Sequence, residues 1–490
     1  MIFKDRHWLL LIFSVTLAVR LLLAFSQPNF TYESYFHLRQ ADHITATGLP
    51  LYNDPLSYGG RELRFLPLFH YLTALSNLFL PLNIVAKILP NLLLASLTII
   101  IYHLARRITP TKQGPLFSAF IAGFLPILFT TNSFTPSSLF IPLVFLAIYA
   151  FLNLPQHLLL YIVTFLLLSF TSSATILLLI GFGFYLLLSF LEQKKVPAAE
   201  LELVIASLFF FVWAQFLFFR DSLIKEGFLF IWQNIPATLL QDYFPKFSIG
   251  QALVAISILP FLGGIIMTYR HLFQLKNQPS FLLISLILST AILSLFRLIQ
   301  LQFALAFYGL IAAVLFAAFY EDSRKYVHKT RVHHYQKYLP AMMLGLLILS
   351  LLPPAIAFAK QQQRPSPQEM MALRWINENL PEDATIIAPL DEGQFVTYYG
   401  QRKNVVDDQF YLIKDIDQRF TDVQSVYTTA FETQALSLLE KYQANYILFT
   451  PHSQERYGLT TLKYYTPKCF EEVYNHETVI YRRKCSLKRE

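Results

Sequence analysis

An acidic and aromatic segment follows the first long apolar run of the chain, in the sequence "YESYFHLRQADHITATGLP". Glu33 lies where the apolar run ends, and a carboxylate there is costly unless it faces water, a cation or another partner. If the segment is helical, Glu33 and His37 share a face because residues four apart align, whereas Arg39 lies on another face. A carboxylate and an imidazole one turn apart can hold an acceptor hydroxyl or amide, or supply two metal ligands. Glu33 is therefore the candidate catalytic residue, with His37 and Arg39 as candidates for substrate binding. A solvated loop acid is the alternative.

Arginines are candidates for binding an anionic substrate, with Arg297 first and Arg61 or Arg64 in reserve. Arg297 stands alone in the apolar stretch "SLFRLIQLQF", and Arg61 and Arg64 lie close together in "GGRELRF". A guanidinium suits this task because it pairs with two phosphate oxygens at once. For Arg297, simple contact with lipid headgroups is the alternative interpretation.

The elements that must position these residues are membrane helices. The chain of 490 residues is 55% hydrophobic and 14% charged, whereas a soluble domain usually carries about 25% charge. Its apolar runs match the roughly 20 residues needed to cross a hydrocarbon core of about 30 Å. We therefore predict a polytopic α-helical membrane protein. About eleven membrane helices are expected, at about 8–26, 84–105, 115–131, 136–153, 157–171, 173–190, 201–219, 248–269, 279–296, 299–319 and 340–360. The shorter segment 65–80 is predicted to be an interfacial or re-entrant helix.

The basic residues predict the orientation of these helices. Lys and Arg concentrate in alternate short gaps, such as "ARRITPTKQ" and "LEQKK", as the positive-inside rule requires of cytoplasmic loops. The net charge of +8 is thus explained by topology, and a nucleic-acid partner is excluded. This assignment predicts a multi-pass protein of the cell (plasma) membrane with a cytoplasmic N-terminus. It places 27–83, 220–247 and everything after 360 on the outer face.

The chain after residue 360 has the character of a soluble domain. Charged residues become frequent, and "EDATIIAPL", "KNVVDDQFYL", "ANYILFTP" and "CFEEVYNHETVIYRRKC" are predicted to form strands, the last as a hairpin. With the helical pattern of "TQALSLLEKYQ", they predict an α/β domain. Two domains are expected: a transmembrane domain over 1–360 with a large first outer loop at 27–83, and an extracytoplasmic α/β domain over 361–490. Cys469 and Cys485 flank the hairpin, where a disulfide and two free thiols are equally compatible with the sequence.

The order of these features resembles a known family. An early membrane helix, a carboxylate in the aromatic segment "ESYFHLRQADHITATGLP" and a Gly-Leu-Pro turn resemble the first loop of GT-C membrane glycosyltransferases. The closest resemblance is to the catalytic subunit of oligosaccharyltransferase and its archaeal relatives. It implies a GT-C-like fold, and it gives Glu33 the place of the first catalytic carboxylate and Arg297 that of the arginine that meets the lipid phosphate.

Two further segments fit the same resemblance. The segment 220–247 lies where the family has a mobile outer loop, and its mixed charged and aromatic residues fit an amphipathic surface helix or a plain connector. The stretch "PLDEG" in the C-terminal region corresponds to a Trp-Trp-Asp-x-Gly motif that reads the acceptor, with Asp391 and Gly393 kept and both tryptophans lost. Asp391 is thus a candidate for substrate binding, with a helix-capping role as the alternative.

The family also implies a divalent cation, Mg or Mn, with Glu33 as one ligand. The outer loop that should carry the second acidic motif is "TTNSFTPSSLF", and it contains no acid. Hydroxyl and amide oxygens replace carboxylates poorly on a hard cation, so the sequence leaves metal dependence open.

The resemblance therefore predicts a membrane enzyme that transfers a sugar or glycan on the outer face. Its donor would be linked to a polyprenyl (dolichyl-type) phosphate, and its partners would be membrane lipids and a glycan or protein acceptor. Two alternatives remain. One is a transporter or flippase of lipid-linked molecules, although the repeated halves and mid-span acids typical of transporters are missing. The other is a non-catalytic GT-C relative, an alternative that the missing second acid leaves open.

Overall fold

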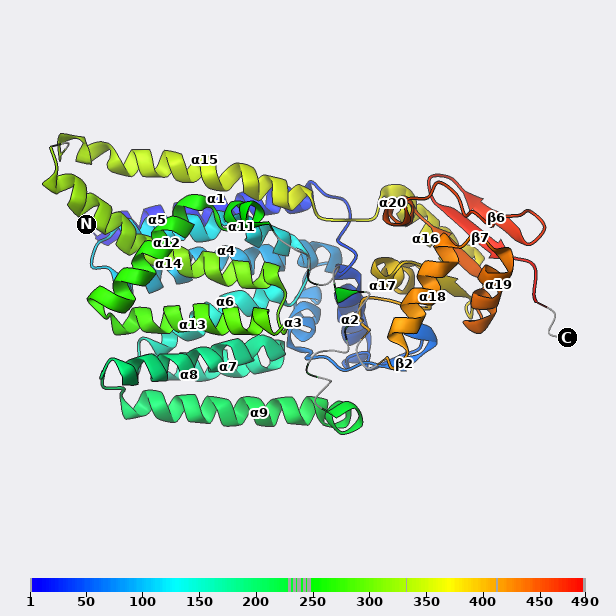
Figure 1. Cartoon of the computed structure of the whole chain (residues 1–490), viewed down its shortest axis with the longest axis horizontal. Helices are drawn as coiled ribbons and strands as arrows, with labels where there is room; N and C mark the ends of the chain where they lie inside the picture. Colours follow the sequence, from blue (N-terminus) through cyan, green and yellow to red (C-terminus); the bar gives the residue numbers. More distant parts are fainter. Residues whose placement is uncertain are drawn as a thin grey trace.

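Figure 1 shows the computed structural model of the chain, a long bundle of helices with an α/β unit at one end. The structure describes residues 2–227, 231, 235, 239–240, 244, 248–331, 333–410 and 413–487. The surface helix or connector expected over 220–247 therefore falls largely outside the described residues.

The bundle is made of apolar helices that run back and forth along its length (Figure 1). They are α1 (Ile2–Phe25), α4 (Leu82–Ile108), α5 (Gln113–Phe124), α6 (Ser137–Phe151), α7 (Leu158–Thr171), α8 (Ile176–Leu191), α9 (Ala198–Glu226), α11 (Ile249–Ile256), α12 (Ile258–Tyr269), α13 (Gln278–Leu295), α14 (Leu301–Lys329) and α15 (Leu339–Lys360). The apolar stretch of α14 is 83% buried, so this helix forms the centre of the bundle. Close contact is possible because small residues face neighbouring helices; a Cβ on Gly309 of α14 would lie 2.6 Å from Leu125.

The predicted membrane class is confirmed, but the count of eleven spans is not. Within the described ranges, eight helices are long and apolar enough to cross a membrane, or nine if one bent pair counts as a single span. The helices α6 and α7 occupy predicted positions but are shorter than these spans. Both are hydrophobic nearly throughout, which is why they were counted among the predicted spans despite the short run at 157–171.

The helix predicted over 248–269 is broken. The helices α11 and α12 meet at an angle of 90°, and the break is at Ser257, whose backbone has φ of 70°. The Ser257 hydroxyl lies 3.0 Å from the Ser350 hydroxyl of α15. The hydropathy of the segment is continuous across the break, so run length could not predict it.

The segment between α1 and α4 forms a cap on the end of the bundle. It contains α2 (Ser34–Thr47), a hairpin of β1 (Asn53–Asp54) and β2 (Arg61–Glu62), and the short helix α3 (Leu68–Asn77). The helix α3 lies where an interfacial or re-entrant helix was predicted, and at 10 residues it is too short to span.

The C-terminal unit is built on a five-stranded mixed sheet (Figure 1). Its strands are β3 (Thr385–Ile387), β4 (Lys403–Asn404), β5 (Tyr446–Phe449), β6 (Phe470–Asn475) and β7 (Val479–Arg483), in the order β4-β3-β5-β7-β6. Strand β3 runs parallel to β4 and β5, whereas β7 is antiparallel to β5 and β6. The helices of this unit are α16 (Pro367–Asn379), α17 (Gly393–Phe395), η8 (Val396–Gly400), α18 (Ile416–Thr428), α19 (Glu432–Lys441) and α20 (Pro451–Tyr457). Cys469 and Cys485 form a disulfide that closes the β6–β7 hairpin, which decides between the two states that the sequence left open.

Candidate functional site

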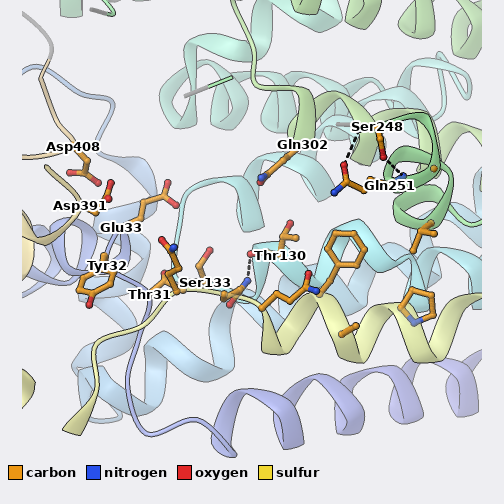
Figure 2. A pocket seen from close by; sticks show the side chains of 18 residues that line it. Thr31, Tyr32, Glu33, Thr130, Ser133, Ser248, Gln251, Gln302, Asp391 and Asp408 are labelled. Atoms are coloured by element: carbon orange, nitrogen blue, oxygen red, sulfur yellow. Dashed lines mark hydrogen bonds between the residues drawn. The ribbon is translucent and has the colours of Figure 1, made fainter. Parts of the chain in front are cut away.

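A cavity of about 920 Å³ lies where the helix bundle meets the C-terminal unit. Figure 2 shows carboxylates gathered at one end of it and the first turn of α11 at the other. Apolar side chains of α11 and α15 complete the wall. The lining residues are Thr31, Tyr32, Glu33, Thr130, Ser133, Ser248, Gly250, Gln251, Val254, Gln302, Pro354, Ala357, Phe358, Gln361, Gln362, Gln363, Asp391 and Asp408.

Glu33 is held at the cavity by the start of α2, where it is the N-cap residue. The neighbouring Ser34 hydroxyl contacts the Thr31 hydroxyl at 2.8 Å and accepts a hydrogen bond from the backbone N–H of Phe134 at 3.1 Å. These bonds tie the start of α2 to the loop between α5 and α6. The Glu33 side chain is open to the cavity, but protein surrounds that cavity, and desolvation raises the pKa of the Glu33 carboxyl. The group is thereby shifted toward the range useful for proton transfer.

Asp408 brings a second carboxylate to Glu33 from a distant part of the chain. Figure 2 shows both at the same end of the cavity. Desolvation raises the pKa of Asp408 well above its usual value, and the negative charges of Asp407, Glu33 and Asp391 raise it further. One oxygen of Asp408 is buried without a hydrogen-bond partner. Asp408 was not among the residues predicted from the sequence, and only the acidic pair in "NVVDDQ" could have indicated it.

The neighbouring Asp407 explains how Asp408 is positioned. Asp407 is fully buried, and its side chain accepts hydrogen bonds from the Ser57 hydroxyl at 2.6 Å and the Asn404 amide at 3.0 Å. The Tyr58 hydroxyl donates to the Asp407 carbonyl at 2.7 Å. The first loop is therefore hydrogen-bonded to the segment after β4, and these bonds hold the backbone next to Asp408 in place.

Asp391 faces the same cavity and is paired on its other side. It forms an ion pair with Arg456 and lies 3.3 Å from Nε2 of His452. Burial alone would raise the pKa of Asp391, but these two groups from α20 bring it below its ordinary value. Desolvation alone would lower the pKa of His452, but its hydrogen bond to Asp391 and the negative charges of Glu392 and Asp391 raise it. Asp391 is thus a charged carboxylate in a fixed orientation.

The opposite end of the cavity carries amides and a helix N-terminus. Ser248 and Gln251 form a capping box at the start of α11, with bonds of 3.2 and 2.9 Å. Gln302, in the first turn of α14, lies between them and the carboxylates in Figure 2. The positive end of a helix dipole and amide N–H groups favour an anion. Among the described residues, no lysine or arginine lines the cavity.

The structure does not bring the predicted arginines into this cavity. Arg297 is exposed in the turn between α13 and α14. Arg39 makes two bonds of 2.7 Å to Asp54, and both side chains are buried. Arg61 lies 3.5 Å from Asp407, behind the cavity wall.

The remaining two predicted residues also lie outside the cavity lining. Arg64 pairs with Glu62 and with Asp221 at 3.2 Å. His37 is buried, shares a 2.9 Å hydrogen bond with His70, and has its pKa lowered to about 3 by desolvation. It is therefore a neutral ring at neutral pH. The expected Glu33–His37 face does not form a joint site, because α2 turns His37 into the aromatic packing around Phe69 and Phe134.

The described carboxylates of the cavity do not form a complete ligand set for a divalent cation. Within the described residues, no group of three or more His, Cys, Asp or Glu side chains is arranged to hold a metal ion. Glu33 and Asp408 share the cavity, but Asp391 is already engaged by Arg456. Among the described residues, these side chains alone do not fit a metal site.

No protein-family model matches the sequence, and no curated protein matches it. Solved structures do match it. The oligosaccharyltransferase of Archaeoglobus fulgidus in its apo form superposes with a TM-score of 0.70 over 91% of this chain and 69% of that chain, at 13% identity. The archaeal oligosaccharyltransferase AglB from Archaeoglobus fulgidus, in complex with an inhibitory peptide and a dolichol-phosphate, gives a TM-score of 0.65 over 90% of this chain and 69% of that chain, at 15% identity.

The structure of a second enzyme matches nearly the whole length of this chain. ArnT from Cupriavidus metallidurans, bound to undecaprenyl phosphate, has a TM-score of 0.55 over 97% of this chain and 98% of its own, at 12% identity. A further structure of the archaeal oligosaccharyltransferase contains zinc and sulfate. These enzymes are GT-C glycosyltransferases, and the chain has a GT-C-like fold, as the resemblance implied.

Proposed function

We propose that this chain is an integral membrane glycosyltransferase that moves a sugar or glycan from a polyprenyl-phosphate-linked donor to an acceptor outside the cell. The observation that carries the proposal is the position of Glu33, in a cavity between the apolar bundle and the C-terminal unit. A lipid-linked donor can approach along the apolar wall, which includes Val254, Pro354 and Phe358. A hydrophilic acceptor can approach from the side of the C-terminal unit.

The chemistry assigned to Glu33 is acceptance of a proton. The acceptor oxygen or nitrogen attacks the anomeric carbon of the sugar, and its proton passes to the Glu33 carboxylate. The bond from that carbon to the phosphate oxygen breaks, and the phosphate leaves with the bonding electrons. Attack opposite the leaving group inverts the anomeric centre. The raised pKa of Glu33 makes its carboxylate a stronger base than an ordinary glutamate, which suits the acceptance of this proton.

Two further carboxylates are proposed to orient the acceptor. Asp408 has an unpaired buried oxygen beside Glu33, and Asp391 is held facing the cavity by Arg456. The start of α11, at the end opposite the carboxylates, and the Gln302 amide, between the two ends, are proposed to meet the phosphate because both offer N–H donors. This arrangement supplies an acidic acceptor end and a donor end lined by neutral N–H groups.

The test is transfer by the purified full-length protein from polyprenyl-phosphate sugars, with and without EDTA. General-base catalysis contributes about 100- to 10,000-fold, so Glu33→Gln should lose at least about 100-fold in rate. Asp408→Asn should lose less, mainly through a higher KM for the acceptor. Glu382→Gln, an exposed acid in the turn before β3, is the matched control and should keep full activity.

A folded Glu33→Gln protein with unchanged activity would remove Glu33 from the mechanism. Movement of donor lipid between leaflets without its consumption would instead indicate transport, and no reaction with any sugar donor would indicate a non-catalytic relative. Loss of activity in EDTA, restored by Mg or Mn, would show that a cation completes the site.

A further inference from the structure

Two cations meet at the edge of the bundle, outside the cavity. The loop after α1, the start of α4 and the linker after α15 come together there, and Figure 1 shows the loop and the linker at the end of the bundle nearest the C-terminal unit. The Asn29 side chain donates to the Pro365 carbonyl at 2.8 Å, and Lys87 Nζ donates to the Gln27 carbonyl at 2.8 Å. These bonds hold Lys87 of α4 and Arg364 of the linker in one place.

Lys87 and Arg364 are neighbours of like charge, and each repels the other. Both side chains are half-buried. Neither forms an ion pair with a carboxylate among the described residues. Arg364 Nη2 donates to the Gln362 side-chain oxygen at 2.8 Å, while its Nε is buried without a partner. Bringing two partly desolvated cations together is unfavourable unless an anion lies between or beside them.

The surroundings of this pair are apolar on the side facing the membrane. The Lys87 ammonium lies 5.3 Å from the ring centroid of Phe25 and 5.8 Å from that of Phe30. On the outer surface of α1, Phe25 is 49% exposed and Leu22 is 72% exposed. Since α1 and α4 are both long enough to span, this apolar surface is available to acyl chains. An anion with hydrocarbon chains fits both halves of the site.

We propose that Lys87 and Arg364 bind the phosphate of a phospholipid headgroup, in the leaflet on the side of the C-terminal unit. The acyl chains of that lipid would lie along Leu22 and Phe25. Basic pockets at the ends of membrane helices bind anionic headgroups in this way. The site is separate from the donor cavity, because neither cation lines it, and the proposal does not depend on the proposed transferase activity.

Gln362 connects this lipid site to the cavity wall. Its side-chain oxygen accepts from Arg364, while its amide donates to the carbonyls of Phe129, at 3.1 Å, and Thr130. Gln362 and Thr130 both line the cavity. A headgroup that fixes Arg364 would therefore also hold this part of the wall in place.

The experiment is native mass spectrometry of the full-length protein in detergent, with phosphatidylglycerol, phosphatidylcholine, polyprenyl phosphate or inorganic phosphate added separately. The double variant Lys87→Gln/Arg364→Gln removes both charges with little change in size. Lys360→Gln, which removes an exposed charge at the end of α15, is the control. We expect one retained phosphatidylglycerol in the wild type and in Lys360→Gln, and at least ten-fold weaker binding in the double variant.

A second measurement, the Tm with and without lipid, separates loss of lipid binding from loss of folding. Phosphatidylglycerol should raise the Tm of the wild type and of the charge-conserving Lys87→Arg/Arg364→Lys variant, but not that of the neutral double variant. Equal lipid binding by the neutral double variant would overturn the proposal. Inorganic phosphate binding as tightly as the lipid would also overturn it, as would polyprenyl phosphate displacing phosphatidylglycerol from this site.

Discussion

At the scale of single residues, the site depends on acids whose surroundings set their protonation. Glu33 and Asp408 face the cavity, whereas Glu392 lies just behind it and is fully buried. The Thr450 hydroxyl donates to one oxygen of Glu392, and the other oxygen has no hydrogen-bond partner. Desolvation, followed by the nearby charges of Glu369 and Asp391, raises the pKa of Glu392 to about 8 against the opposing effect of His452. The Glu392 carboxyl therefore keeps its proton at neutral pH, next to the charged Asp391.

The raised pKa of Glu392 predicts a pH dependence of stability. Its folded pKa is about 8, and its unfolded pKa is about 4.3, so the folded protein binds more protons between these values. Its stabilising contribution is full below the unfolded pKa and is lost as pH rises toward 8. Glu392→Gln should thus match the wild type near pH 5 and melt several degrees higher near pH 8. Thermal unfolding across this range is the measurement, with Glu382→Gln as control, and identical pH profiles for Glu392→Gln and wild type would contradict it.

At the scale of elements, α2 is the part that places Glu33. One side of it is bonded to the α5–α6 loop through Ser34. The other side packs on the C-terminal unit, where the Tyr35 ring lies 5.0 Å from Phe395 and the Tyr398 hydroxyl donates to Asp42 at 3.0 Å. A helix held on both sides keeps its N-cap residue in a fixed position, as the role proposed for Glu33 requires.

The Arg39–Asp54 pair ties α2 to the hairpin that follows it, and this predicts a role in stability. Asp54 also accepts hydrogen bonds from the backbone N–H groups of Leu56 and Ser57. Arg39→Met should lower stability by about 3–5 kcal/mol, because it leaves a buried carboxylate without its partner. The double variant Arg39→Met/Asp54→Asn should recover part of that loss. Thermal unfolding of the single and double variants tests this, and a wild-type Tm in Arg39→Met would contradict the stabilising role of the pair.

At the scale of the whole molecule, the cavity belongs to no single segment. Its wall combines the first loop, the α5–α6 loop, α11, the start of α14, the end of α15 and two loops of the C-terminal unit. Any rotation of the C-terminal unit against the bundle would separate Asp391 and Asp408 from Glu33. The aromatic packing of Tyr35 on that unit and the bonds from Ser57 and Tyr58 to Asp407 oppose such a movement.

The proposed orientation of the molecule predicts the redox state of its cysteines. If the C-terminal unit lies outside the cell, the Cys469–Cys485 disulfide should form in living cells, because disulfides persist in oxidising compartments. Protein denatured directly from cells and treated with a maleimide reagent should react only after reduction, with both thiols. Reaction of both thiols without reduction would place the C-terminal unit in the cytoplasm.

The sequence by itself determined the membrane class, most helix positions, the α/β character of the C-terminal unit and the location of Glu33 at the end of the first span. These features depend on apolar run length, strand patterns and charge distribution, which are local properties of the chain. The tertiary structure alone decided that Asp408 faces Glu33, that Arg39 and His37 have partners inside the protein, that Ser257 breaks a helix and that Lys87 meets Arg364. Each of these depends on contacts between segments far apart in the chain, and no local pattern of residue types encodes such contacts.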